Sequence, residues 1–147
     1  MQPLTSFDEL SPGQEFHFGS FSLSEAEILD FARRFDPQPF HVDPEAARAS
    51  IFGGLIASGL HTQAAAFGHI IRTGWVEKVS LGGTEQVVRW PAPVRPGDEI
   101  ALSARIEDLI PSRSKPDRGV AKVRYTGTRV SDGTVVLDIL GTHFLKR

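Results

Sequence analysis

The residues best suited to chemistry lie in one short segment, Phe35-Asp36-Pro37-Gln38-Pro39-Phe40-His41-Val42-Asp43. It places a carboxylate, Asp36, and an imidazole, His41, five residues apart on an expected loop. Proline fixes its own backbone and restricts the residue before it, so Pro37 and Pro39 stiffen this loop. A carboxylate and an imidazole that hold one water can take one proton from it and deliver another, which is what hydration of a conjugated double bond needs.

Both side chains also have a purely structural interpretation. Asp36 could end its helix in an Asx-type turn, and His41 could be a partly buried loop residue bonded to backbone. An Asp and a His near each other in sequence are a weak signal. The residues alone leave both interpretations open.

Three helices are expected in the first half of the chain. Ser24-Glu25-Ala26-Glu27 forms a capping box, and an apolar stripe then continues to a helix end at Asp36. Asp43 and Pro44 begin a short helix that runs to about Ser50. The third helix runs from Ser58-Gly59 to Thr73 and carries no Asp or Glu, which predicts that it is buried on most sides.

The second half of the chain has the alternation of half-buried strands. After a short strand near Gln14 to Phe18, strands are expected from Thr84 onward, with turns at Arg95-Pro96-Gly97-Asp98 and Ser131-Asp132-Gly133. The last strand runs from about Thr134 to Phe144. The pattern predicts an α+β fold, an antiparallel sheet holding one buried helix.

Composition narrows the class of protein. A length of 147 residues suits one domain, residues 1–147, and a net charge of −2 argues against a nucleic-acid partner. The absence of cysteine excludes a disulfide framework, a thiolate nucleophile and a cysteine zinc site. The N-terminal residues lack the features of a secretory signal, and no run of about 18 apolar residues indicates a membrane span, so a cytoplasmic protein is expected.

Two segments together resemble a known family. Asp36-Pro37-Gln38-Pro39-Phe40-His41-Val42-Asp43-Pro44 and Gly53-Gly54-Leu55-Ile56-Ala57-Ser58-Gly59 look like the signature of the MaoC-like dehydratases, which include the R-specific enoyl-CoA hydratases. The resemblance extends over nearly the whole chain. It implies a hot-dog fold, in which an antiparallel sheet wraps around one long central helix, and a homodimer with substrate tunnels near the subunit interface. It also implies an acyl-CoA or acyl-carrier thioester substrate, with coenzyme A as part of the substrate and no further cofactor.

The resemblance also implies roles for individual residues. Those matching Asp36 and His41 hold and activate the water, and the N–H of Gly59 binds the thioester oxygen. A glycine amide at a helix N-terminus suits that role physically, because the carbonyl gains negative charge as water adds, although glycines also serve as turn and packing residues. The expected substrate-binding residues are Phe40, Phe52, Leu55, Ile56, Ser58 and Phe67.

Four positions depart from the family pattern. Gln38 replaces the usual Asn, and Phe40 replaces an aliphatic residue. Ser58 stands where hydratases often have His, and either donates to the oxyanion or caps the helix. Phe67 stands where some R-specific hydratases have a Ser bonded to the catalytic Asp, so Asp36 is expected to lack that partner.

Other polar clusters give weaker signals. His61 and His69 have no Asp, Glu or Cys nearby in metal-ligand spacing, so no metal site is expected and both are interpreted as lining or core residues. The cations of the loop Pro111–Arg118 suit the phosphates of coenzyme A, but a solvated loop is the simpler interpretation.

Two other functions remain open. A hot-dog thioesterase would also bind an acyl thioester, but it usually needs an acid on or beside the central helix. A non-catalytic acyl-binding protein of the same fold is the second alternative, against which the presence of both Asp36 and His41 argues.

Overall fold

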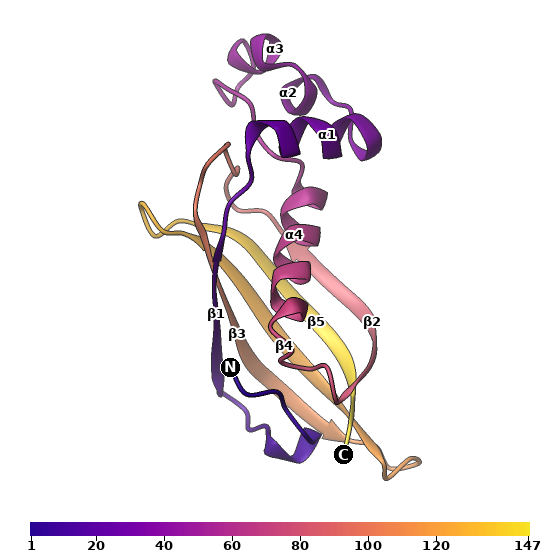
Figure 1. The fold of residues 1–147 in the computed structure, drawn as a ribbon. Coiled ribbons are helices and arrows are strands. Elements are labelled where there is room, and N and C mark those ends of the chain that lie inside the picture. The colour runs from indigo at the N-terminus through magenta and orange to yellow at the C-terminus, as the bar shows by residue number, and fades with distance from the viewer.

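One five-stranded antiparallel sheet forms the framework of the computed structural model, which describes residues 1–147. The strand order is β1-β3-β4-β5-β2. Figure 1 shows the sheet curving around a long helix, α4 (Gly59–Arg72). This is the hot-dog arrangement that the family resemblance implies. The strands are β1 (Glu15–Phe21), β2 (Ser80–Arg89), β3 (Ile100–Pro111), β4 (Arg118–Arg129) and β5 (Val135–Lys146).

The inner face of the sheet follows from the alternation of apolar residues along β3 and β4. Ile100, Leu102, Ala104 and Ile106 are all buried, and their neighbours in sequence are more exposed. Because side chains alternate across a strand, one face of the sheet meets α4 and closes the core. β1 and β2 are longer than expected: β1 continues to Phe21, and β2 begins at Ser80 rather than at Thr84.

The segment between β1 and α4 forms a helical cap at one end of the sheet (Figure 1). It contains α1 (Glu25–Phe35), α2 (Pro39–Val42) and α3 (Pro44–Arg48), and a short 3-10 helix, η1 (Phe7–Glu9), precedes β1. The Ser24 hydroxyl accepts a hydrogen bond from the Glu27 amide, as the capping box predicts. The prediction of a loop between Asp36 and Asp43 is wrong in part, because Pro39 begins a one-turn helix in this segment. In that turn the Val42 amide donates to the Gln38 carbonyl.

The central helix is buried on one face rather than on most sides, which corrects the expectation from its composition. His61, Thr62, Ala66 and Ile70 are buried against the sheet and α1, whereas 49% of Leu60 is exposed. The reason is architectural, since the sheet covers only one face of α4 and no second layer covers the other. None of the helices has the length and the apolar composition of a membrane-spanning segment.

Burial of His61 predicts a measurable dependence of stability on pH. Its ring stacks on Phe31 at 4.4 Å between centroids, and its Nδ1 is buried without a hydrogen-bond partner. Burial lowers the pKa of His61 despite the opposing charge of Glu27. The unfolded chain therefore binds this proton first as the pH falls, so the free energy of unfolding should decrease below about pH 6.5, by at most ~1.4 kcal/mol per pH unit.

We expect His61→Phe to reduce this slope when unfolding by urea is followed between pH 7 and pH 5. The slope should not vanish, because burial also lowers the pKa of His143. His17→Phe, at an exposed position, is the matched control and should keep the wild-type slope. Equal slopes for His61→Phe and wild type would contradict the assignment.

Candidate active site

The carboxylate of Asp36 is held in place by hydrogen bonds from two other elements. Asp36 is the C-cap of α1, and its Oδ2 accepts a hydrogen bond of 2.7 Å from the Ser58 hydroxyl at the N-cap of α4. Its Oδ1 accepts one of 2.8 Å from the Gln38 side-chain amide. Burial alone would raise the pKa of Asp36, but these two hydrogen bonds and the nearby His41 outweigh it and hold the pKa below its ordinary value. The carboxylate is therefore ionised at neutral pH.

The imidazole of His41 is buried and has a defined orientation. Its Nδ1 lies 2.8 Å from the carbonyl oxygen of Ile56. A carbonyl only accepts, so Nδ1 carries a proton and donates it there. The other ring nitrogen, Nε2, faces Asp36 Oδ2 at 3.3 Å. When His41 is neutral, Nε2 and Oδ2 are both acceptors, and a shared donor such as a water molecule satisfies both.

An unused backbone donor lies in the same cavity. Gly59 is the first residue of α4, where helix amides lack intrahelical acceptors. The Ser58 hydroxyl caps the amide of Leu60, and the N–H of Gly59 has no acceptor within the protein. This free amide at the positive end of the helix dipole can bind a developing oxyanion.

The three groups open into one cavity of about 440 Å³. All of the predicted catalytic residues line it, as do four of the predicted substrate-binding residues. The full lining is Asp36, Gln38, Phe40, His41, Phe52, Ile56, Ala57, Ser58, Gly59, Leu60, Thr62, Trp90, Pro91, Ala92, Pro93, Val94 and Val136.

Two of the predicted substrate-binding residues lie elsewhere. Leu55 is buried and borders a shallow groove beside α3. Phe67 lies two turns further along α4, where it meets Tyr125 with ring centroids 6.1 Å apart in a second cavity. Asp36 has no partner at position 67, but Ser58 supplies a hydroxyl in its place. Since the single proton of Ser58 is given to Asp36, its hydroxyl does not donate to an oxyanion.

The segment Trp90–Val94 lines the cavity but was not predicted from the sequence to belong to the site. Trp90 donates from its indole N–H to the Gly59 carbonyl at 2.9 Å. In the same segment, the Pro93 carbonyl accepts a hydrogen bond of 2.6 Å from Arg129, which helps to hold the segment in place. A Trp-Pro-Ala-Pro run just before the Arg95 turn was the available signal, but nothing in sequence links it to Gly59.

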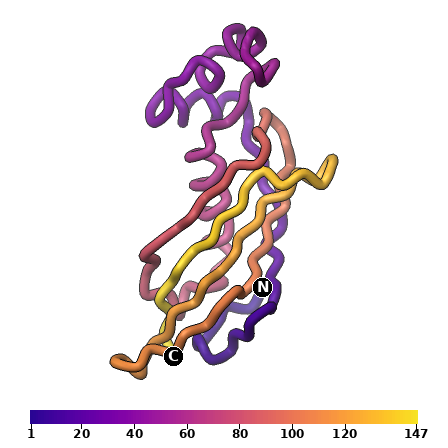
Figure 2. The backbone as a smooth tube through the Cα atoms, turned by 180° about the vertical axis from the view of Figure 1, so that it is seen from behind, coloured from indigo at the N-terminus to yellow at the C-terminus, as the bar shows by residue number.

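The remaining polar candidates lie away from this cavity. His69 bonds to the Phe18 carbonyl through Nε2 at 2.7 Å, and no three His, Asp or Glu side chains come together as a metal site. At the end of the loop between β3 and β4, Asp117 pairs with Arg118, the first residue of β4. Figure 2 shows this loop at the end of the sheet opposite the helical cap.

The sheet curved around α4, with an acid–base pair and a free helix amide in one cavity, defines a hot-dog protein with an enzyme-like site. A model of the MaoC like domain matches residues 8–130, and the chain belongs to this MaoC-like dehydratase family. It is 38% identical to the uncharacterized protein YdeM of Bacillus subtilis over 109 residues, which cover 74% of this chain and 77% of YdeM.

Solved structures agree with this assignment. The MaoC-like dehydratase from Rhodospirillum rubrum superposes with a TM-score of 0.88, at 34% identity and 95% coverage of both chains. The R-hydratase PhaJ1 from Pseudomonas aeruginosa shares the fold, with a TM-score of 0.68 at 24% identity, over 96% of this chain and 84% of that one.

The contact between Gly59 and Trp90 predicts a steric penalty for any side chain at position 59. A Cβ on Gly59 would lie 2.5 Å from the indole ring. We expect Gly59→Ala to displace Trp90, to change its fluorescence, and to lower the free energy of unfolding by about 1–3 kcal/mol. Because Trp90→Ala removes the clash, adding Gly59→Ala to that variant should cost much less. An equal cost in both backgrounds would show that the ring does not cover this glycine.

Proposed function

We propose that this chain hydrates a 2-enoyl thioester to the 3-hydroxyacyl thioester and catalyses the reverse dehydration. The observation that carries the proposal is the 3.3 Å approach of His41 Nε2 to Asp36 Oδ2, with the His41 Nδ1–H already given to Ile56. Two fixed acceptors of this kind bind a water through both of its protons. The free N–H of Gly59 in the same cavity supports a place for the thioester carbonyl.

The proposed reaction assigns a role to each of the three groups. Because the pKa of Asp36 is held low, His41 Nε2 takes the proton while the water oxygen bonds to C3 of the substrate. The π electrons move through C2 to the thioester oxygen, where the Gly59 amide stabilises the charge. The imidazolium, stabilised beside the Asp36 carboxylate, then returns its proton to C2. Dehydration runs through the same steps in reverse.

The class of substrate rests on the family and on the lining of the cavity. A relative of the same fold is described as an R-hydratase, and we extend a hydratase activity to this chain. Phe40, Phe52 and Ile56 supply apolar contacts for an acyl group carried on coenzyme A or an acyl-carrier protein.

We also propose that the active form is a homodimer. β2 is an edge strand, and nearly all of its residues are exposed, including the apolar Leu81 and Val87. An exposed edge with apolar side chains is suited to pairing with another strand.

A kinetic prediction concerns the acid–base pair. Asp36→Asn and His41→Ala should each lower kcat for crotonyl-CoA by about 10²–10⁴-fold, the usual contribution of general acid–base catalysis. The loss of crotonyl-CoA absorbance measures hydration. Asp117→Asn and His17→Ala, both at exposed positions outside the cavity, are matched controls and should keep wild-type rates.

Parallel assays distinguish the alternative functions. Release of free thiol would indicate a thioesterase, and binding without turnover would indicate an acyl-binding protein. Full activity in both Asp36→Asn and His41→Ala would disprove the proposed roles even if the wild type were a hydratase.

The hydrogen bond from Ser58 gives a prediction for the titration of Asp36. The Ser58 hydroxyl helps to hold the pKa of Asp36 below the ordinary value, so Ser58→Ala should raise that pKa. Asp36 is ionised above its pKa and becomes protonated as the pH falls through it. The pH dependence of the ¹³C chemical shift of the Asp36 side-chain carboxyl should therefore have its midpoint at higher pH in Ser58→Ala than in wild type. An unchanged midpoint would instead assign Ser58 a purely structural role.

A further inference from the structure

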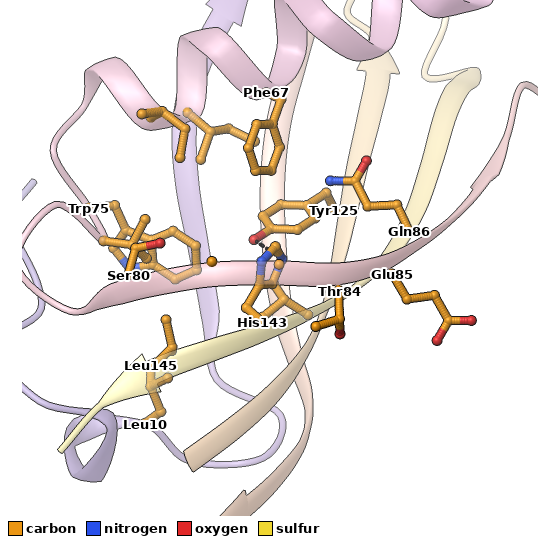
Figure 3. A pocket seen from close by; sticks show the side chains of 16 residues that line it. Leu10, Phe67, Trp75, Ser80, Thr84, Glu85, Gln86, Tyr125, His143 and Leu145 are labelled. Atoms are coloured by element: carbon orange, nitrogen blue, oxygen red, sulfur yellow. Dashed lines mark hydrogen bonds between the residues drawn. The ribbon is translucent and has the colours of Figure 1, made fainter. Parts of the chain in front are cut away.

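A second cavity, of about 450 Å³, lies beneath the C-terminal half of α4, between the helix and strands β2, β4 and β5. It shares no lining residue with the candidate active site. Figure 3 shows Phe67 on one side of it, with Tyr125 and His143 together near its centre. None of the proposed catalytic steps uses these residues.

The walls of this cavity suit an apolar molecule without a net charge. Nine of the 16 lining residues are hydrophobic, among them Phe67, Ile70, Trp75, Val123 and Leu145. No Lys or Arg lines the cavity, so a carboxylate or phosphate would find no permanent counter-charge. The one acid of the lining, Glu85, belongs to the exposed strand β2, and in Figure 3 it extends away from Tyr125 and His143.

The polar groups near the centre of the cavity are a phenol and an imidazole bonded to each other. The cavity is also lined by Ser80, Thr84, Glu85 and Gln86 of the exposed strand β2. The Trp75 indole N–H has no hydrogen-bond partner, but this atom is fully buried and does not reach the cavity surface. The Tyr125 hydroxyl lies 3.0 Å from His143 Nε2, and neither ring has another hydrogen-bond partner in the protein. Burial raises the pKa of Tyr125 and lowers the pKa of His143, so both are neutral at pH 7. Glycine leaves room beside the imidazole, because a Cβ on Gly83 would lie only 3.3 Å from Nδ1.

A count of protons shows what this pair offers. Neutral Tyr125 and His143 carry two exchangeable protons, one O–H and one N–H. The hydrogen bond between them uses one, whichever ring donates. The other remains as a donor without an acceptor, either as Nδ1–H or as the phenolic O–H. A buried or partly buried donor left unpaired is costly, so an acceptor on a bound molecule would be favoured at this point.

We propose that the cavity beneath α4 binds an uncharged, mainly apolar chain that carries one oxygen atom, which accepts a hydrogen bond from the Tyr125–His143 pair. This apolar ligand is either a free small molecule or the far part of the substrate's acyl group. In both cases its oxygen belongs to a ketone, a hydroxyl or a similar neutral acceptor.

The two tryptophans allow a direct test of binding. Trp75 lines this cavity and Trp90 lines the candidate active site, so Trp75 is the only tryptophan left in a Trp90→Phe variant. In that background, 2-octanone is compared with 2-methyl-1-octene, in which a methylene group replaces the oxygen. We expect Trp75 fluorescence to respond to both, with the ketone binding roughly 3- to 10-fold more tightly, as one net hydrogen bond provides.

The decisive variant combines Tyr125→Phe with His143→Phe. Either single change leaves one unpaired donor, so each should keep a preference for the ketone, whereas the double change removes both donors. Ketone and alkene should then bind equally, and unchanged alkene affinity shows that the cavity is intact. No response of Trp75 in the parent, equal affinities in the parent, or a preference that survives in the double variant would each overturn the proposal.

A kinetic comparison distinguishes the two sources of the ligand in the second cavity. If this ligand is part of the substrate's acyl group, 7-oxo-2-octenoyl-CoA should have a higher kcat/KM than 2-octenoyl-CoA, and the double variant should lose that advantage. If it is a free ligand, the two thioesters should have equal kcat/KM in both proteins. The fluorescence test needs no turnover, so failure of the proposed hydratase activity leaves it valid.

Discussion

The candidate site depends on the pairing of two stretches of chain that are far apart in sequence, the Asp36–His41 segment and the Ile56–Gly59 segment. The amide of Ile56 donates to the Phe40 carbonyl at 3.2 Å, and the carbonyl of Ile56 accepts from His41 at 2.8 Å. Two residues later, Ser58 donates to Asp36. These hydrogen bonds fix the acid and the imidazole relative to the first amide of α4, so the three groups of the candidate site are held together.

The same pairing determines the chemistry of each group. The Ile56 carbonyl keeps a proton on Nδ1 and so leaves Nε2 facing the cavity. Ser58 and Gln38 stabilise the charged form of Asp36 against the effect of burial. The result is an ionised carboxylate beside a ring nitrogen that can accept a proton, an arrangement suited to a shared water.

The central helix links this site to the rest of the fold. Its N-terminus supplies Ser58 and Gly59 to one cavity, and its C-terminal half forms the roof of the second. The core that packs Ala66 and Ile70 against the sheet therefore holds both cavities in place. Because the two cavities share no lining residue, substitutions at Tyr125 and His143 can test the second cavity without altering Asp36 or His41.

Features that depend on neighbouring residues could be predicted from the sequence. The capping box and the prolines define the ends of α1 and α3, alternation defines β3 and β4, and two short motifs point to the candidate acid–base pair and to the glycine at the start of α4. The side chains that meet across long separations were known only from the folded chain. Ser58 rather than a residue at position 67 bonds to Asp36, Trp90 covers Gly59, and Tyr125 meets His143. Such contacts arise from the packing of α4 on the sheet and the docking of the helical cap, and local propensity carries no information about them.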